Sequence, residues 1–432
     1  MMSSPRMNAP RSRHDIHGTI DAVWRMESAR VIAGLVRMVR DVGLAEELAQ
    51  DALVAALEKW PETGVPDNPA AWLTTTARNR AIDRLRHLKL RGEKHAQVAY
   101  ELEQLQDDAE QRDDLLLDDP VGDDLLRLMF ISCHPVLPPE SRVALTLRLL
   151  GGLETGEIAR AFLASEPTVA QRIVRAKRTL AEANVPFEIP RREELPARLA
   201  AVLGVIYLVF NEGYAATSGE DWVRPALCEE ALRLGRILAG LMPGEAEVHG
   251  LVALMELQAS RLHARIGADG EPVLLPDQDR SRWDRLLIGR GLAALERAQR
   301  LGGTLGPYAL QAAIAACHAR AVAASDTDWA RIVALYDALA QLQPSPVVEL
   351  NRAVTVSMAF GPEAALGRVD ALCDEPKLAN YHLLPSVRGD LLFRLGRRAE
   401  ARAEFERAAA MTGNARERDL LLARAAQCAP IP

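Results

Sequence analysis

The sequence predicts an all-α protein. Its composition favours helices, because Ala, Leu and Arg are abundant while aromatic residues make up only 4% of the 432 residues. Long segments repeat apolar residues at steps of three and four, which places them on one face of a helix. Proline and glycine separate these segments, and the length is enough for about three domains of roughly 150 residues.

Charge and cysteine content limit the class of protein. The net charge of −7 does not indicate a nucleic-acid-binding protein, but opposite local charges can be hidden in such a total. The five cysteines are scattered and form no CxxC, which is typical of reduced thiols in a cytoplasm. We expect no signal peptide, because the polar start "MMSSPRMNAPRSRHD" has no apolar core. The longest apolar run, "LAAVLGVIYLVF", is too short to span a bilayer, so no membrane contact is expected.

The N-terminal part is expected to be a disordered tail over residues 1–18 and a helical domain over 19–95. "TIDAVWRMESARVIAGLVRMVR" and "LAEELAQDALVAALEKW" have amphipathic patterns, and "PETGVPDNP" is expected to form a loop. A third helix, "AAWLTTTARNRAIDRLRHLKLR", concentrates basic side chains: Arg78, Arg80, Arg84, Arg86, Lys89 and Arg91. An acidic linker over 96–122 follows, and its composition is that of a solvated spacer.

A second helical domain is expected over residues 123–184. "PPESRVALTLRLLGG" begins with prolines and a glutamate and ends in two glycines, which are helix start and stop signals. "TGEIARAF", the short turn "LAS" and "EPTVAQRIVRAKRTL" then have the spacing of a helix-turn-helix. The simpler alternative is an ordinary amphipathic helical hairpin.

The last of these helices has one apolar and one basic stripe. Val169, Ile173, Ala176 and Leu180 share a face that is expected to be buried. In a helix-turn-helix, the side chains suited to base edges are Ala170, Gln171, Val174 and Arg175, and those suited to phosphates are Thr168, Arg172, Lys177 and Arg178.

The region 196–432 reads as successive helices separated by Pro or Gly. "VVELNRAVTVSMAFGPEAALGRVDAL" and "HLLPSVRGDLLFRLGRRAEARAEFERAAAM" each predict two helices around a glycine-containing turn. The small-residue pattern of the second is typical of a tetratricopeptide (TPR) hairpin, in which alanine lets helices approach closely. We interpret this region as a TPR-like domain of degenerate repeats.

Several stretches resemble chemical sites, but simpler interpretations are available. Cys133-His134 and Cys317-His318 are adjacent on helices and point apart, so no metal site is predicted. In "FNEGY", Gly213 is expected to end a helix in a left-handed conformation; the alternative is a contact surface or ligand pocket formed by Asn211, Glu212 and Tyr214. The acids of "DGEPVLLPDQDRSRWD" are expected at helix starts after a turn. No catalytic motif is found, so neither an enzyme nor a cofactor is predicted.

Two segments together resemble a known family. "AEELAQDALVAALEKW" with "AWLTTTARNRAIDRLR" resembles region 2 of bacterial extracytoplasmic-function sigma factors, and "LETGEIARAFLASEPTVAQRIVRAKRTL" resembles their region 4. The order, the acidic linker and the long extension are similar to the subgroup with a C-terminal TPR-like domain. Ala170 departs from the family pattern, in which this position is often basic.

The resemblance implies partners and roles for particular residues. The partners are core RNA polymerase, through its β′ clamp and β flap, and promoter DNA. Glu47, Gln50 and Asp51 would bind the clamp. The loop Glu62–Pro69 would capture a flipped base of the minus-ten element through Asp67 and Asn68, whereas Trp72 is expected in the core. Arg78, Asn79, Arg80, Arg84 and Arg86 would contact DNA near the melted region, with Asp83 holding an arginine.

The resemblance therefore predicts a cytoplasmic sigma factor. Helix 166–180 would read the minus-thirty-five element, and the acidic linker would mimic a polyanion in the RNA exit channel. The C-terminal domain would regulate initiation in cis through a ligand or partner that the sequence does not identify. Two alternatives stay open: a helix-turn-helix regulator that acts without polymerase, and a helical-repeat scaffold.

Overall fold

The computed structural model describes residues 13–90, 120–268 and 270–429, and these form a helical protein, as the composition and periodicity predicted. The chain divides into two compact units, Met1–Val205 and Ile206–Pro432, and each is described by itself. The division falls inside helix α9 (Leu195–Tyr214).

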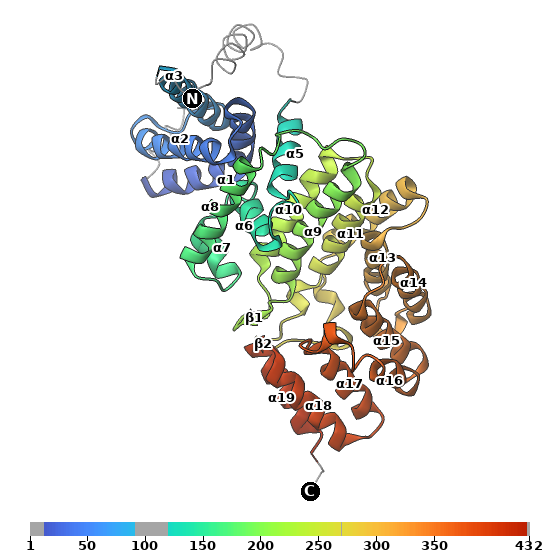
Figure 1. The fold of residues 1–432 in the computed structure, drawn as a ribbon. Coiled ribbons are helices and arrows are strands. Elements are labelled where there is room, and N and C mark those ends of the chain that lie inside the picture. Colours follow the sequence, from blue (N-terminus) through green and yellow to red (C-terminus); the bar gives the residue numbers. More distant parts are fainter. Residues whose placement is uncertain (1–12, 91–119, 269, 430–432) are drawn as a thin grey trace, which may run out of the picture. The chain divides into compact units, whose positions relative to one another are not determined.

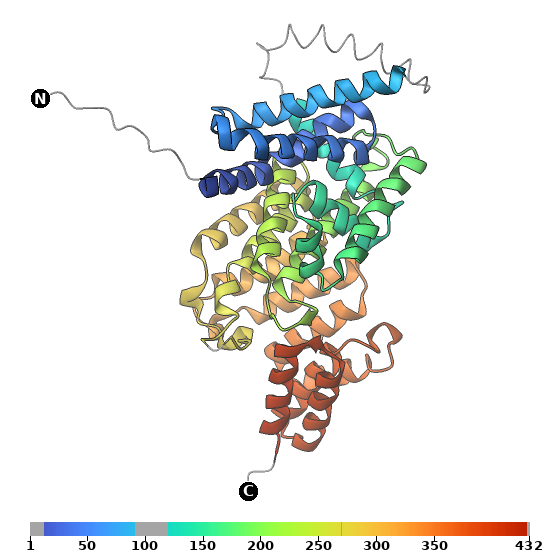
Figure 2. The same ribbon diagram turned by 90° about the vertical axis from the view of Figure 1, so that its left-hand side faces the viewer.

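The first unit contains the helices α1 (Arg13–Val39), α2 (Val42–Thr63), α3 (Pro69–Leu90), α5 (Pro120–Ser132), α6 (Pro139–Leu149), α7 (Thr155–Ala161), α8 (Glu166–Glu182) and the first part of α9. Helices α1, α2 and α3 pack side by side (Figure 2). Their shared core is rich in alanine, because Ala45, Ala49, Ala52 and Ala56 of α2 are fully buried. Small side chains let the helix backbones approach closely.

Three details of this unit differ from the sequence expectations. Helix α1 begins at Arg13, so residues 13–18 are helical rather than part of a tail; Ile16 and Ile20, one turn apart, are both buried. Helix α2 continues through Pro61 to Thr63, so the loop begins only at Gly64. A proline in the last turn removes one backbone donor, and Gly64 ends the helix with φ 85° and an N–H bond to the Trp60 carbonyl. Most of the predicted acidic linker lies outside the described residues, and its end is helical because α5 starts at Pro120.

The second unit continues with β1 (Ser218–Gly219), α10 (Pro225–Leu241), α11 (Ala246–Ala259), η1 (Leu262–Ala264), η2 (Leu275–Asp277), η3 (Arg280–Arg282), α12 (Arg285–Gly302), α13 (Pro307–Arg320), η4 (Ala324–Asp326), α14 (Trp329–Leu342), α15 (Pro346–Phe360), α16 (Pro362–Asp370), η5 (Pro376–Leu378), α17 (Leu383–Arg394), α18 (Arg398–Met411), β2 (Gly413–Asn414) and α19 (Ala415–Gln427). Sequential helices pack on one another along the unit (Figure 1).

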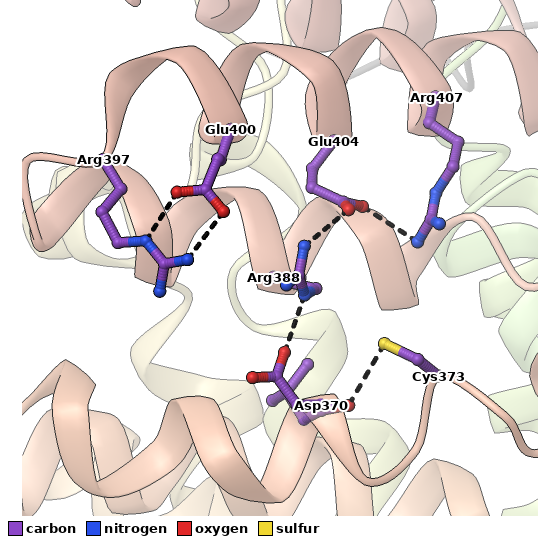
Figure 3. A network of polar contacts seen from close by, with 8 residues as sticks. Asp370, Cys373, Arg388, Arg397, Glu400, Glu404 and Arg407 are labelled. Atoms are coloured by element: carbon purple, nitrogen blue, oxygen red, sulfur yellow. Dashed lines mark hydrogen bonds and ion pairs between the residues drawn. The ribbon is translucent and has the colours of Figure 1, made fainter.

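Both predicted helix pairs are present. Gly361 (φ 94°) joins α15 to α16, and Gly396 (φ 77°) precedes α18 after α17. In the second pair, a Cβ on Gly389 would lie 2.9 Å from the ring of Phe405, so only glycine allows α17 and α18 to pack this closely. Ion pairs join three successive helices here: Arg388 of α17 binds Asp370 of α16 at 2.8 Å and Glu404 of α18 at 2.7 Å (Figure 3).

The two short strands connect distant parts of the second unit. Ser218 pairs with Gly413 and Gly219 with Asn414 in a parallel register. The Asn414 side chain is fully buried and donates to the carbonyls of Ala216 (3.1 Å) and Asp221 (2.8 Å). These bonds connect β2, which lies between α18 and α19, to the loop that follows α9.

Helix α9 is the one described helix that is long and apolar enough to cross a membrane by length and composition. Its side chains Val202, Val209 and Phe210 are nevertheless buried inside the protein. We therefore interpret α9 as a core helix.

His318 gives the second unit a pH-dependent stability. Burial lowers its pKa to about 4, helped by the nearby Arg261 and Arg280 guanidinium groups. Between about pH 6.5 and pH 4, His318 is protonated in the unfolded chain but neutral in the folded chain. The free energy of unfolding should therefore fall as the pH drops below about 6.5. We expect a loss of about 2 kcal/mol between pH 7 and pH 5 from this residue.

Urea unfolding of the wild type and of His318→Gln, at both pH values, measures this effect. Carboxyl groups titrate equally in both proteins, so the wild type should lose more stability than the variant by that amount. Equal losses would show that His318 does not contribute.

Candidate nucleic-acid interface

Helices α7 and α8 form a helical hairpin (Figure 1). The face of α8 that is buried in this hairpin is the face predicted from the sequence. Val169, Ile173, Ala176 and Leu180 are the buried residues of α8. Ile158 and Ala159 of α7 are also buried, and α7 packs against α8. The apolar stripe therefore builds the core of the hairpin and leaves the opposite face of α8 to solvent.

The opposite face of α8 carries most of the side chains expected to read DNA. Gln171, Val174, Arg175 and Arg178 are exposed, whereas Ala170 and Arg172 are half-buried. Val174 is 63% exposed. An exposed apolar group next to a glutamine and an arginine suits contact with a thymine methyl beside hydrogen-bonded base edges.

The N-terminus of α8 is capped by its own chain. Ser165 accepts a bond from the Thr168 N–H at 3.3 Å, and the two hydroxyls lie 2.7 Å apart. Leu163 adopts φ 47° in the preceding turn and is 53% exposed. The Thr168 hydroxyl is thus shared with the cap, so a phosphate would have to compete with Ser165 for it.

Lys177 of α8 is held by an acid within the same unit. Glu46 of α2 is buried and forms an ion pair with Lys177 and another with the Arg148 Nε of α6, at 2.6 Å from its Oε1. Gln50 donates to the same carboxylate at 2.9 Å. Lys177, which is expected to contact phosphate, neutralises a buried charge in this arrangement, and an unpaired buried carboxylate would be costly.

Helix α3 presents the second basic surface. Asn79, Arg84 and Arg86 are exposed, and Arg78 and Arg80 are half-buried. Arg80 pairs with Asp51 of α2 at 3.4 Å, and Arg86 pairs with Asp83 at 3.8 Å. Asp83 therefore holds an arginine, as expected from the sequence.

The loop between α2 and α3 exposes both Asp67 and Asn68. The side-chain oxygen Oδ1 of Asn68 accepts a bond from the Ala71 N–H at 3.1 Å and so caps the start of α3, which leaves the side-chain NH2 group as a donor. Trp72 is half-buried and packs edge-on against the buried Trp60, with ring centroids 5.4 Å apart. Trp72, which was expected in the core, is therefore only partly buried.

The three side chains expected to bind polymerase do not behave alike. Glu47 is exposed on α2. Gln50 and Asp51 are half-buried, and their polar groups already contact Glu46 and Arg80. Glu47 is thus the member of this set that is most available to a partner.

"FNEGY" lies inside the second unit and ends helix α9, but Gly213 is not among the glycines with positive φ, so its expected left-handed conformation is wrong. Helix α9 continues to Tyr214, and a Cβ on Gly213 would lie 2.7 Å from the Cys228 nitrogen, so the glycine allows close packing on α10. Glu212 is buried and paired with Arg224, so it cannot belong to a contact surface. Asn211 and Tyr214, in contrast, line a cavity.

The other chemical-looking stretches have structural roles. Cys133 is buried beside Thr146, and burial raises the pKa of its thiol to about 11, while the His134 ring accepts a bond from the Val136 N–H at 3.2 Å. Asp279 and Asp284 cap η3 and α12, as expected for helix-start acids. Among the residues that the structure describes, no three His, Cys, Asp or Glu side chains are grouped as metal ligands would be.

Comparisons with known proteins relate these surfaces to families. Residues 24–91 match sigma-70 region 2, residues 127–180 match sigma-70 region 4, and residues 198–299 match a family of unknown function (DUF6596). An uncharacterized protein of Rhizobium meliloti is 47% identical over 404 residues, 93% of each chain. This chain belongs to the same family as that protein.

More distant relatives have descriptive names. A probable ECF RNA polymerase sigma factor, SigI, of Mycobacterium tuberculosis is 26% identical over 175 residues, 40% of this chain and 58% of that protein. The ECF RNA polymerase sigma factor SigK of Mycobacterium ulcerans is 26% identical over 155 residues, 35% of this chain and 78% of its own length. Together with the region 2 and region 4 matches, they support a sigma factor of the extracytoplasmic-function type. No solved structure matches the chain.

Sequence reasoning missed Glu46 and Arg148. Both lie in amphipathic helices, and nothing in the local pattern shows that one acid of α2 will be buried opposite cations of α6 and α8. The one local signal in the sequence is that Glu46 has the small apolar residues Ala45 and Ala49 on either side. Both alanines are fully buried in the structure.

Proposed function

We propose that this chain binds core RNA polymerase and directs initiation at particular promoters, with α2 on the β′ clamp, α3 and its preceding loop at the minus-ten element, and α8 at the minus-thirty-five element. The observation that carries the proposal is the exposed stripe of α8 opposite a fully apolar inner stripe, following a region 2 match in the order found in sigma factors. Sigma factors act in the cytoplasm, and we expect this chain there, with no catalytic role.

The linkage of two DNA-binding regions explains how selectivity would arise. Each region presents only a short helix and a few base-reading side chains, so each would bind DNA weakly by itself. Polymerase would fix their spacing and convert two weak contacts into one selective contact. The same logic predicts that the free protein binds duplex DNA poorly.

Fluorescence anisotropy with a labelled promoter duplex tests this directly. We expect promoter-specific binding only when core polymerase is added to the full chain. A helix-turn-helix regulator that acts alone would bind the duplex tightly without polymerase, as a dimer on a palindrome. A scaffold would bind neither DNA nor polymerase, so either of these results would contradict the proposal.

Charge reversal at Glu47 is expected to weaken binding to core polymerase by at least about tenfold, because a new like-charge contact would face a basic partner surface. The measurement is a titration of labelled protein with core enzyme. Glu58→Lys is the matched control, since Glu58 is also exposed on α2 but outside the proposed contact. Equal weakening by both variants would show a general charge effect rather than a specific contact.

We further propose that the C-terminal helical region regulates initiation in cis and has TPR-like packing. The glycine-containing turns and the close α17–α18 approach support that packing. Transcription assays that compare the full chain with residues 1–188, which end between α8 and α9, test the regulation. We expect the two proteins to differ in activity on one promoter, and equal activity would contradict a cis role.

A further inference from the structure

The second unit contains a cavity of about 260 Å³ between α9, α11, α13 and α14. Pockets for drug-sized ligands start at roughly 300 Å³, so this cavity suits only a ligand smaller than those. Asn211 and Tyr214 of "FNEGY" line it from α9, and Trp283 lines it from the segment before α12.

Aromatic side chains are strongly concentrated around the cavity. Five of its fifteen lining residues are aromatic, although aromatic residues make up 4% of the chain. They are Tyr207, Phe210, Tyr214, Trp283 and Tyr336. Phe210 and Tyr214 stack with centroids 5.8 Å apart and an interplanar angle of 15°. Flat walls of this kind favour a planar guest, because ring faces gain most from contact with another ring.

The cavity also has one strong positive charge and no negative one. Arg261 is its only lining arginine or lysine, and no aspartate or glutamate lines it. The Arg261 Nε donates to Gln258 Oε1 at 3.1 Å, and its Nη2 donates to the same oxygen, but among the described residues no carboxylate forms an ion pair with its guanidinium. Other arginines of the unit do have such partners, as in the Arg236–Glu256 pair at 2.8 Å.

Neighbouring arginines strengthen this positive character. The Arg265 guanidinium lies 3.9 Å from the centre of the Tyr214 ring. Arg280 donates to the carbonyls of His318 (2.6 Å) and Ala321 (2.8 Å). Burial lowers the pKa of Arg261; Tyr214 and Tyr336 raise it, and the charge of Arg265 lowers it further. An anion placed beside Arg261 would compensate its buried charge.

The cavity lining also includes polar groups that would orient a bound ligand. Within the described part of the chain, His318 Nδ1 and Trp283 Nε1 are buried and have no hydrogen-bond partner. Both residues line the cavity. Buried polar atoms normally have partners, so a guest with an acceptor group would satisfy the indole donor at least.

We propose that this cavity is a binding site for a small planar anion of the aromatic carboxylate class, with the carboxylate on the Arg261 guanidinium and the ring against the tyrosines and Trp283. A guanidinium is planar and presents parallel donors that match a carboxylate. The site goes beyond the proposed transcriptional role and would give the C-terminal region a chemical signal to respond to.

Isothermal titration calorimetry of the full chain with 2-naphthoate tests the site. We expect saturable binding, at least about tenfold weaker binding of the neutral 2-naphthamide, and a similar loss in Arg261→Gln, since each change removes a charge-assisted contact. Arg290→Gln removes an exposed charge of the same unit and should leave binding unchanged. No saturable binding, or equal affinity for acid and amide, would overturn the proposal.

Ala315→Phe tests whether the ligand occupies the cavity, because the phenylalanine ring would fill that space. The substitution removes no polar group, so an effect on binding would not come from a lost polar contact. It should abolish naphthoate binding while the thermal midpoint stays near that of the wild type; unchanged binding would overturn the proposal. If a variant does not fold, the acid-over-amide preference of the wild type, read by quenching of tryptophan fluorescence, still decides the question. These measurements need neither polymerase nor DNA, so their failure is distinguishable from failure of the proposed sigma role.

Discussion

Replacing Glu46 by alanine is expected to destabilise the contact between α2, α6 and α8 by about 3–5 kcal/mol. Glu46 is 4% exposed and binds Arg148 and Lys177, so its loss would leave two partly buried cations without a carboxylate. Hydrogen–deuterium exchange of peptides from α2 and α8 measures this locally, and protection there should fall by about 100-fold or more.

The matched control is Glu58→Ala, the same substitution at an exposed position of α2. It should change stability by less than about 0.5 kcal/mol. Similar protection in Glu46→Ala and the wild type would show that the buried ion pairs do not hold these helices together.

Replacing Arg175 by alanine is expected to lower initiation from a cognate promoter by about 5- to 100-fold. Arg175 is exposed on the reading face of α8, and a bidentate arginine–guanine contact contributes about 1–3 kcal/mol of discrimination. The variant should also tolerate base changes at one minus-thirty-five position, which a set of substituted promoters in a transcription assay would detect.

Arg178→Ala should behave differently. Arg178 is exposed and paired with Glu182 at 2.6 Å, and we assign it to phosphate contact. Its loss should weaken binding similarly at all sequences and reduce the salt dependence by about one charge. Arg192→Ala, an exposed arginine after α8, serves as the control. A loss of base preference in Arg178→Ala and none in Arg175→Ala would contradict the proposed orientation of α8.

The sequence predicted the elements whose local pattern is strong. The buried stripe of α8 was correct at all four positions, because the spacing of apolar residues alone decides which face of a helix is buried. The helix pairs at Gly361 and Gly396 were predicted for a similar reason, since glycine tolerates the positive φ that the turns require.

Features that depend on distant residues were missed. Gly213 was expected in a left-handed conformation at a helix end, but a glycine is needed there because α10 passes so close, and no local pattern reveals this neighbour. Glu212 and Lys177 looked available to partners, yet each is paired with a charge that the fold brings to it. Only Asn211 and Tyr214 of the cavity were suggested by the sequence, because the rest of its wall comes from other helices and from the segment before α12.

Run-off transcription by core RNA polymerase, with and without the full chain, is the most direct test of a sigma role. The template is the DNA upstream of the gene for this protein, followed by a random promoter library if that DNA is inactive. Transcripts with a defined start should appear only when the chain is added. No defined transcript from either template, together with no co-elution of the chain with core polymerase, would contradict the proposal that this protein is a sigma factor.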